Sequence, residues 1–219
     1  MAITFEKYIL TATVAAIFVF AAVVSANADG RGVFEAKGCA SCHITKGPDT
    51  AKTVEDLVKA KGPELWYSGS KYKEGFLEKW LAKPLPIRPM AYYSLEKKNP
   101  GNHPSLSAED AKSVAVYLMT LKAPNVSRGT IKPENSRQGR AVFEKKFGCY
   151  GCHLLIKEGS EIGGLSGPSL VGASKRYNPD WVFEYLKNPK RFKSVMTMPV
   201  SAGTDAEFKA LAAYLATFE

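Results

Sequence analysis

The chain has 219 residues, of which 45% are hydrophobic and 23% are charged, a composition ordinary for a globular protein. Its length allows two small domains or one large domain. The formal net charge is +9, but lysine and arginine are scattered along the chain, which argues against a nucleic-acid-binding protein. Such a basic surface is either simply solvated or steers an acidic protein partner into place.

The N-terminus has the pattern of a targeting segment. An apolar run extends from Tyr8 to Val24 and is interrupted only by two threonines. Ala26 and Ala28 follow with the spacing of a signal-peptidase site. The run is long for a cleaved signal and just long enough, with its flanks, to span a bilayer. We therefore assign residues 1–28 to a signal or membrane-anchor segment, and we favour a retained hydrophobic helix. The rest of the chain is then expected on the periplasmic or extracytoplasmic face of the cytoplasmic membrane.

A short motif, Cys-x-x-Cys-His, occurs twice in the remaining chain and contains all four cysteines and two of the three histidines. The pattern is typical of covalent c-type haem attachment, in which two thiols add to the vinyl groups of one haem and the adjoining imidazole binds its iron. A redox dithiol, half of a zinc site or a structural disulfide would account for the cysteines but would leave the histidines unexplained. We therefore predict two covalently attached haem c groups. Their expected attachment residues are Cys39, Cys42 and His43 in the first motif and Cys149, Cys152 and His153 in the second.

The two motifs belong to a longer internal repeat. Each is preceded by a glycine and a phenylalanine four residues apart, on one face of a short predicted helix. Residues 62–84 align without gaps with residues 167–189, and both segments begin with Gly-Pro-x-Leu. Apolar periodicity predicts closing helices over 108–121 and 205–218, with Ser107 and Thr204 as N-caps.

Repetition on this scale indicates a duplicated domain. The first domain is expected over 29–122 and the second over 139–219. The intervening linker, 123–138, is rich in proline, asparagine, serine and glycine, which predicts irregular structure. Signals for β-strands are absent, so we predict an all-α fold for both domains.

Together these features resemble dihaem class I cytochromes c over residues 30–219. In that family, an N-terminal helix with a glycine and an aromatic residue crosses a C-terminal helix near the haem edge. The resemblance implies two tandem cytochrome c-like domains, each wrapped around one covalent haem. It also implies that the carbonyl groups of Pro63 and Pro168 accept a hydrogen bond from the proximal imidazoles, which fixes the orientation of those rings.

The sixth ligand of each iron decides what the haem can do. In the second domain Met198 lies 45 residues after the motif histidine in a Met-Pro pair like that of the family, and Met196 is the alternative. In the first domain Met90 lies 47 residues after its motif histidine in a proline-rich loop, and His103 is the rival. Met90 precedes alanine instead of proline, a departure from the family pattern. The expected metal ligands are therefore His43, Met90, His153 and Met198.

A histidine and a thioether fill both axial positions of an iron and leave no open site for a substrate. The expected function is therefore electron transfer in a respiratory chain and not catalysis. The protein would be a membrane-anchored carrier or a haem subunit of a membrane oxidoreductase complex, with redox protein partners that present acidic docking surfaces. The alternative is a dihaem enzyme resembling a peroxidase or a thiosulfate dehydrogenase, in which one haem has an exchangeable site.

Overall fold

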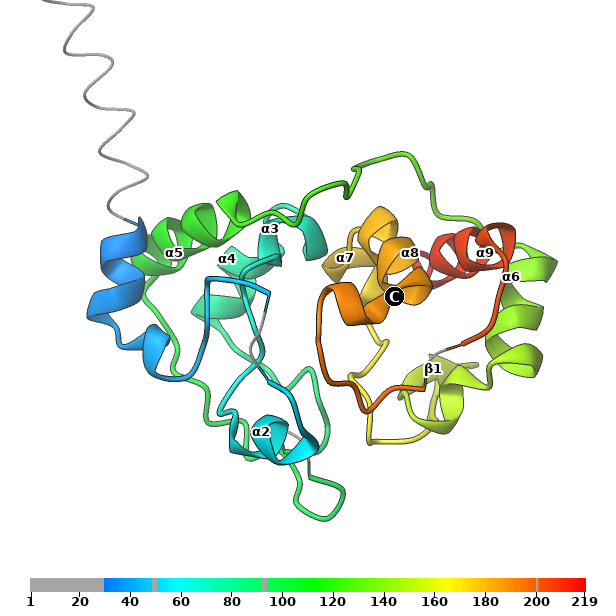
Figure 1. Ribbon diagram of the computed structural model, residues 1–219, viewed down its shortest axis with the longest axis horizontal. Coiled ribbons are helices and arrows are strands. Elements are labelled where there is room, and N and C mark those ends of the chain that lie inside the picture. Colours follow the sequence, from blue (N-terminus) through cyan, green and yellow to red (C-terminus); the bar gives the residue numbers. More distant parts are fainter. Residues whose placement is uncertain (1–29, 49–50, 92–93, 200) are drawn as a thin grey trace, which may run out of the picture.

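The computed structural model describes residues 30–48, 51–91, 94–199 and 201–219. The apolar run from Tyr8 to Val24, and with it the expected signal or anchor, lies outside the described residues. Among the residues that are described, no helix is long and apolar enough to cross a membrane. The chain forms two halves that lie side by side, and an irregular segment connects them along one edge of the molecule (Figure 1).

The two halves share most of their order of elements, but the first has α2 where the second has the strands β1 and β2. The first half starts with helical residues 30–36. These are followed by a 3₁₀ turn at Cys39–Ser41 in the motif, α2 (Val54–Lys59), α3 (Ser68–Lys71), α4 (Phe76–Ala82) and α5 (Ala108–Thr120). The second half consists of α6 (Arg137–Ala141) with its π-helical continuation Val142–Lys146, a 3₁₀ turn at Cys149–Gly151, β1 (Leu155–Lys157), β2 (Ser160–Ile162), α7 (Ala173–Arg176), α8 (Pro179–Lys187), a 3₁₀ turn at Pro189–Arg191 and α9 (Asp205–Leu215).

The closing helices confirm the sequence prediction. Ser107 caps α5 by accepting a hydrogen bond from the amide of Asp110, and Thr204 caps α9 by accepting one from the amide of Glu207. Such caps satisfy backbone donors that the first turn of a helix leaves unpaired. Both helices therefore begin where the capping residues predict.

One segment departs from the predicted all-α fold. Strands β1 and β2 form an antiparallel hairpin in which Leu155 pairs with Ile162 and Lys157 pairs with Ser160. Glu158 and Gly159 connect the strands with positive φ angles of 51° and 78°. Because both central residues adopt left-handed conformations, they form the kind of tight turn that joins two twisted strands. The prediction of a chain without strands is therefore wrong here, although the described fold is otherwise mainly helical.

In each half the first helix crosses the closing helix at a glycine. A Cβ atom added to Gly30 would lie 2.2 Å from the carbonyl oxygen of Ser113 in α5. A Cβ atom added to Gly139 would lie 2.5 Å from the carbonyl oxygen of Ala210 in α9. Real side chains do not approach a backbone oxygen so closely, so only glycine allows the helices to pack at these points.

The aromatic residue four positions after each of these glycines strengthens the crossing. Phe34 packs edge-on against Tyr117 of α5, with ring centroids 5.6 Å apart, and Phe143 packs against Tyr214 of α9 at 5.8 Å. Edge-to-face pairs at such distances are favourable aromatic contacts. The predicted crossing of the first and last helices is thus confirmed in both halves.

The halves face one another across a local twofold arrangement. Tyr72 and Tyr177 occupy equivalent positions in the repeat, form an antiparallel bridge, and stack with ring centroids 6.1 Å apart. Two backbone hydrogen bonds flank them, from the amide of Lys73 to the carbonyl of Arg176 (2.9 Å) and from the amide of Asn178 to the carbonyl of Lys71 (2.8 Å). Lys73 and Asn178 are equivalent in the repeat, and so are Lys71 and Arg176. The two halves therefore make the same contact with each other, as the two subunits of a symmetric dimer do.

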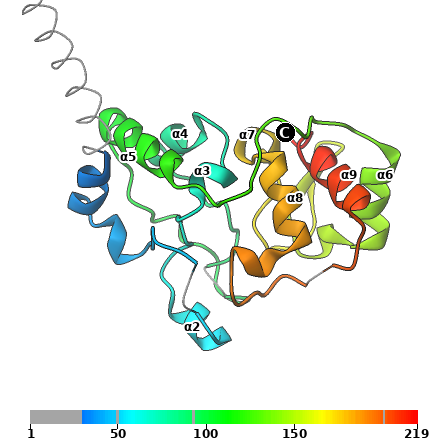
Figure 2. The same cartoon turned by 45° about the horizontal axis from the view of Figure 1, so that its top comes forward.

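A separate hydrophobic core fills the space between the halves, where α3 lies next to α8 (Figure 2). Its buried side chains are Tyr67 from the first half, Ala123 and Ile131 from the connecting segment, and Trp181, Val182, Phe192, Ala212 and Ala213 from the second half. The segment between α5 and α6 has no helix or strand and contributes to this core, and the linker predicted over 123–138 overlaps the start of α6 at Arg137. The two halves are therefore packed together and not merely tethered.

The segment after α4 in the first half contacts the Gly-Pro segment of the second half, and the segment after α8 in the second half contacts the Gly-Pro segment of the first. The Lys193 ammonium group lies 3.1 Å from the Glu64 carboxylate, and these side chains are only 14% and 6% exposed. In the opposite direction, the amide of Ser169 donates a hydrogen bond of 2.7 Å to the carbonyl of Ile87. These crossed contacts bring the distal loop of each half next to the proximal segment of the other.

Candidate haem sites

The two Cys-x-x-Cys-His motifs adopt the same local structure. Each begins after a glycine in the left-handed region, Gly38 with φ 70° and Gly148 with φ 56°. The amide of His43 then donates a hydrogen bond of 3.0 Å to the carbonyl of Cys39, and the second motif repeats this bond at 3.1 Å. A single tight turn therefore carries two thiols and one imidazole in each half.

All four cysteines are free thiols, which argues against a structural disulfide. Burial raises the pKa of Cys39, and it raises the pKa of Cys149 to about 11. A redox-active dithiol needs a lowered thiol pKa, so these surroundings do not favour that chemistry. Within the part of the chain that the structure describes, no three His, Cys, Asp or Glu side chains converge as they would at a zinc site. Thioether links to a haem are the use of these thiols that agrees with their surroundings.

A backbone carbonyl orients each motif histidine. The distance from His43 Nδ1 to the carbonyl oxygen of Pro63 is 2.8 Å, and the distance from His153 Nδ1 to that of Pro168 is 2.7 Å. A carbonyl oxygen can only accept, so each Nδ1 must carry the proton and donate it. The lone pair of Nε2 is then available to an iron, which is the arrangement the family resemblance implies for these prolines.

Burial also keeps both imidazoles in the form that binds a metal. It lowers the pKa of His43 and of His153, although the bonds to the proline carbonyls act in the opposite direction. The neutral form is therefore favoured at physiological pH. Because a histidine ligand must be neutral, both rings are prepared for coordination.

The glycine before each of these prolines supports the same ring, a role that sequence reasoning missed. A Cβ atom added to Gly62 would lie 2.6 Å from Cε1 of His43, and one added to Gly167 would lie 2.6 Å from Cε1 of His153. The Gly-Pro pair therefore holds the imidazole by contact and by a hydrogen bond. Its repetition in the sequence was the available signal, but it did not reveal that the glycine touches the ring.

Replacing Gly167 with alanine is expected to displace the His153 ring and to weaken its bond to the iron of the second haem. The added methyl group would require a shift of several tenths of an ångström in a close-packed site. The holoprotein should then show a change in the ferric absorption spectrum and the reduction potential of one haem. Gly151→Ala is the matched control, because a Cβ atom there meets nothing within 4 Å. Equal effects of the two variants would contradict this role of Gly167.

Several buried donors at the boundary between the halves also fit a haem. Among the described residues, Nε1 of Trp66, Nε1 of Trp181 and Nε of Arg176 have no hydrogen-bond partner. Buried donors are normally paired, and an unpaired one needs a specific explanation. A haem carries two carboxylate side chains, and carboxylates accept hydrogen bonds from such donors. These three residues are therefore suited to hold haem propionates.

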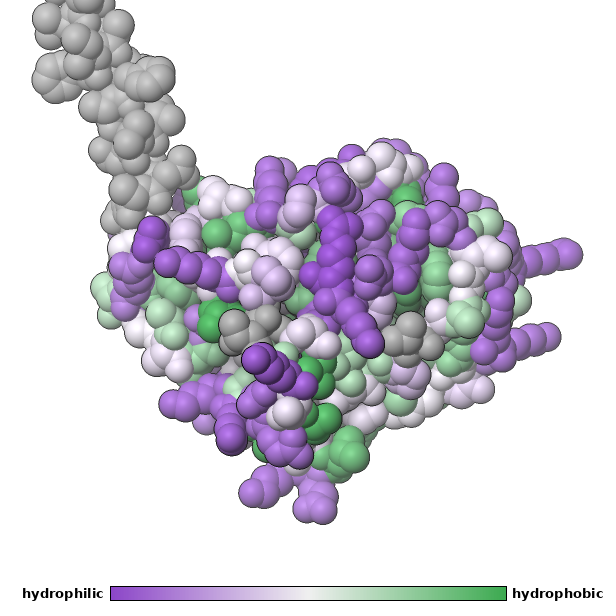
Figure 3. Space-filling view, in the orientation of Figure 1, coloured by the Kyte–Doolittle hydropathy of each residue, from purple (hydrophilic) through white to green (hydrophobic). Residues whose placement is uncertain are grey.

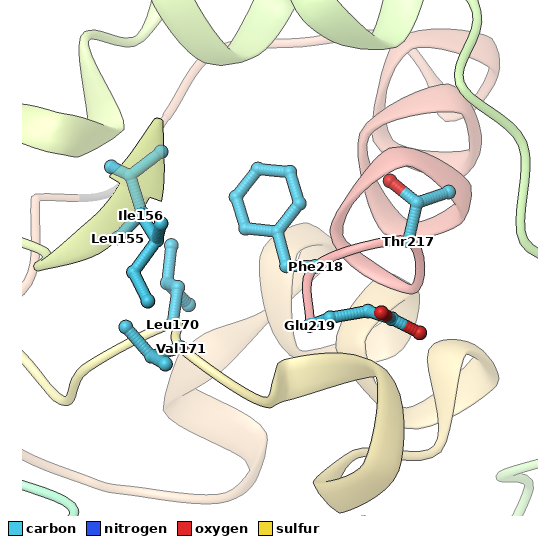
Figure 4. A pocket seen from close by; sticks show the side chains of 7 residues that line it. All are labelled: Leu155, Ile156, Leu170, Val171, Thr217, Phe218 and Glu219. Carbon is cyan, nitrogen blue, oxygen red and sulfur yellow. The ribbon is translucent and has the colours of Figure 1, made fainter. Parts of the chain in front are cut away.

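An open pocket of about 260 Å³, lined by both apolar and polar groups, lies near the second motif (Figure 4). It lies between β1, the segment after Pro168 and the C-terminal end of the chain, and its lining consists of Leu155, Ile156, Leu170, Val171, Thr217, Phe218 and Glu219. Leu155 follows the motif histidine by two residues, and Leu170 follows Pro168 by two. These two lining residues are apolar, as contact with a porphyrin requires.

The structure places the candidate sixth ligands in different surroundings. Met196 and Met198 are half-buried in the loop before α9. Met90 is only 9% exposed, and its backbone forms an antiparallel bridge with Lys98. The ring of His103 lies 6.1 Å from the ring of His43, centroid to centroid. The first half thus brings the rival ligand His103, which sequence spacing placed second, close to its motif histidine.

Comparison with known proteins agrees with this site. Residues 27–122 and 136–219 match the family model described as Cytochrome c. The chain therefore belongs to the cytochrome c family and carries two such domains, each with one covalently bound c-type haem. Domains of this family transfer electrons through that haem. No curated protein and no solved structure matches the chain.

Proposed function

We propose that the protein is a respiratory electron carrier with two closed haem sites, and not an enzyme. Each haem, when bound, exchanges one electron as its iron alternates between the ferrous and ferric states. The observation that supports this most directly is the pair of matching bonds from His43 to Pro63 and from His153 to Pro168. They hold both imidazoles in one orientation, so little has to move when the charge of an iron changes.

The proposed axial ligands follow from the same residues. His43 and His153 would each bind one haem iron, and Met198 is the proposed further ligand of the second iron, with Met196 as its neighbour in the loop. Met90 and His103 are the candidates for the first iron. With both axial positions filled, neither haem offers a site for oxygen or a small substrate.

The packing of the two halves supports a role as one electron-transfer unit. A shared core, the twofold contact of Tyr72 and Tyr177, and the ion pair of Glu64 and Lys193 all join the halves. An interface that contains a hydrophobic core and backbone hydrogen bonds restrains relative motion of two domains. The two haems would therefore keep a constant separation while electrons pass between them.

The proposed partners are redox proteins with acidic docking surfaces. The chain has a formal charge of +9, and hydrophilic side chains are spread among paler and hydrophobic ones over the face in Figure 3. We further propose that the N-terminal segment attaches the protein to the cytoplasmic membrane, so that it works on the extracytoplasmic face, as an anchored carrier or as a subunit of an oxidoreductase complex. Electrostatic steering would make its reaction with such a partner slower at higher ionic strength.

Carbon monoxide and hydrogen peroxide test the closed sites. The reduced holoprotein should bind no carbon monoxide at neutral pH, and the protein should not turn over peroxide, because no axial position is open. The denatured protein is the positive control, because unfolding releases the sixth ligands and leaves a haem that binds carbon monoxide. Binding of carbon monoxide at one haem of the native protein, or steady peroxide turnover, would instead favour the dihaem enzyme.

A further inference from the structure

We propose that His103, and not Met90, is the sixth ligand of the first haem iron, so that two histidines bind this haem. The inference rests on the proposed function, in which both irons have six ligands. It deepens that function, because a haem with two histidines has a lower reduction potential than one with histidine and methionine. The two haems of the chain would then differ in potential.

The separation of the two rings agrees with a shared iron. Their centroids are 6.1 Å apart, and the ring planes are inclined by 43°. A metal–imidazole bond is about 2 Å long, and each ring centroid lies roughly 1 Å beyond the bound nitrogen, so two axial imidazoles hold their centroids roughly 6 Å apart. The observed distance between His43 and His103 is therefore the distance that one iron between them requires.

The hydrogen bonds of both rings engage Nδ1 and leave the same nitrogen, Nε2, facing away from a carbonyl partner. Nδ1 of His103 is 2.9 Å from the carbonyl oxygen of Pro104, and Nδ1 of His43 is 2.8 Å from that of Pro63. Each Nδ1 must donate to its carbonyl, which leaves Nε2 of both rings with a free lone pair. This is the usual way in which a protein orients a histidine ligand.

The loop that carries His103 is held at both of its ends. At its start, the Asn99 side chain donates a hydrogen bond of 3.0 Å to the carbonyl of Arg88. At its end, the amide of Leu106 donates one of 2.9 Å to the carbonyl of Leu81 in α4. The ring of Trp80, also in α4, packs on the imidazole at 4.7 Å. The ring of His103 is thus positioned by its contact with α4.

Met90, in contrast, follows Pro89 at the start of a segment whose two ends are joined by backbone hydrogen bonds. The amide of Asn99 donates to the carbonyl of Pro89 (2.9 Å), and the amide of Ala91 donates to the carbonyl of Lys97 (2.8 Å). Residue 99 therefore lies beside residue 89, although ten positions separate them in the sequence. With only 9% of its surface exposed, the Met90 side chain is covered by protein atoms, which leaves little of it to contact a porphyrin.

The position of Met198 relative to the closing helix of the second half also favours His103 over Met90. Met198 lies seven residues before α9 begins at Asp205. His103 lies five residues before α5 begins at Ala108, whereas Met90 lies 18 residues before it. Measured from the closing helix, His103 therefore occupies nearly the position of Met198. The segment between residues 89 and 99 accounts for the longer interval from His43 to His103 than from His153 to Met198.

Near-infrared magnetic circular dichroism of the ferric holoprotein tests the proposal, because it separates imidazole from thioether ligands. We expect one haem with two imidazoles and one with imidazole and thioether. The chain has three histidines and two of them belong to the motifs, so a haem with two imidazoles in the monomer can use only His103. Two thioether-ligated haems in the wild type would overturn the proposal and leave the electron-transfer function intact.

Variants extend the test. His103→Ala should remove the two-imidazole signal and give a high-spin haem that binds cyanide, and added imidazole should restore the low-spin state. His103→Met should retain a six-ligand haem with a raised potential, which covers the case in which the alanine variant folds poorly. Met90→Leu is the matched control and should leave both signals unchanged; loss of one signal in this variant would overturn the proposal. A high-spin haem already present in the wild type would contradict the closed-site function itself.

Discussion

Replacing Glu64 with glutamine is expected to lower the free energy of unfolding of the holoprotein by about 3–5 kcal/mol, because it removes the carboxylate charge that faces the largely buried Lys193 ammonium group. Both side chains are largely buried, at 6% and 14% exposure, so water cannot replace the lost interaction. Lys193→Gln should cost a similar amount for the converse reason. Denaturant unfolding at equilibrium, followed by far-ultraviolet circular dichroism, measures both.

A double-mutant cycle makes this prediction specific to the pair. The variant with both substitutions should lose clearly less stability than the sum of the two single variants, because it removes both charges together. Lys187→Gln is the control, since the Lys187–Asp205 pair is exposed and such pairs contribute at most about 1 kcal/mol. Additive losses would mean that the ion pair does not join the two halves.

Replacing Gly30 with alanine is expected to lower the free energy of unfolding by about 1–3 kcal/mol, the usual cost of overpacking a closely packed contact. The new Cβ atom would lie 2.2 Å from the carbonyl oxygen of Ser113 and 3.1 Å from Cβ of Tyr117. The helices would have to separate at the point where they cross. The pairing of Phe34 with Tyr117 would be weakened by the same movement.

Gly32 provides a matched control in the same helix. A Cβ atom added to Gly32 meets nothing within 4 Å, so Gly32→Ala should raise stability by up to about 1 kcal/mol through helix propensity alone. Thermal unfolding of the two alanine variants, measured side by side, should therefore give shifts of opposite sign. A shift of the same sign and size in both would show that the crossing does not depend on Gly30.

The parts of the site that depend on short stretches of chain could be predicted from the sequence. The motif turn and the capped closing helices follow local patterns, whereas the bonds from His43 to Pro63 and from His153 to Pro168 are implied by the family resemblance. These patterns repeat in the two halves, so each copy supports the interpretation of the other. Local chemistry and covalent spacing are sufficient for such features.

The interface between the halves could not be predicted in this way. Tyr72 and Tyr177 were recognised as equivalent residues, but nothing in the repeat shows that they pack on each other. The partner of Glu64 is 129 residues away in the chain, and only the tertiary fold brings Lys193 to it. The hairpin after the second motif was also missed, because its strands are three residues long and too short to give a periodic signal.

The sixth ligand of the first haem shows a different limit. The interval from His43 to Met90 nearly equals that from His153 to Met198, which made Met90 the expected ligand. A count along the chain does not reveal that hydrogen bonds join residue 99 to residue 89 and residue 91 to residue 97. Once these bonds are known, the distance from the closing helix becomes the better guide, and it favours His103.

A reversible redox titration of the purified holoprotein, followed by its visible absorption spectrum, tests the central claim most directly. The account predicts two one-electron steps, both complete without an added substrate, with the first haem at the lower potential. Reduction and oxidation should follow the same curve, because both irons keep their ligands. A single step for only one haem, or a step that proceeds only with an added substrate, would contradict a carrier with two closed haem sites.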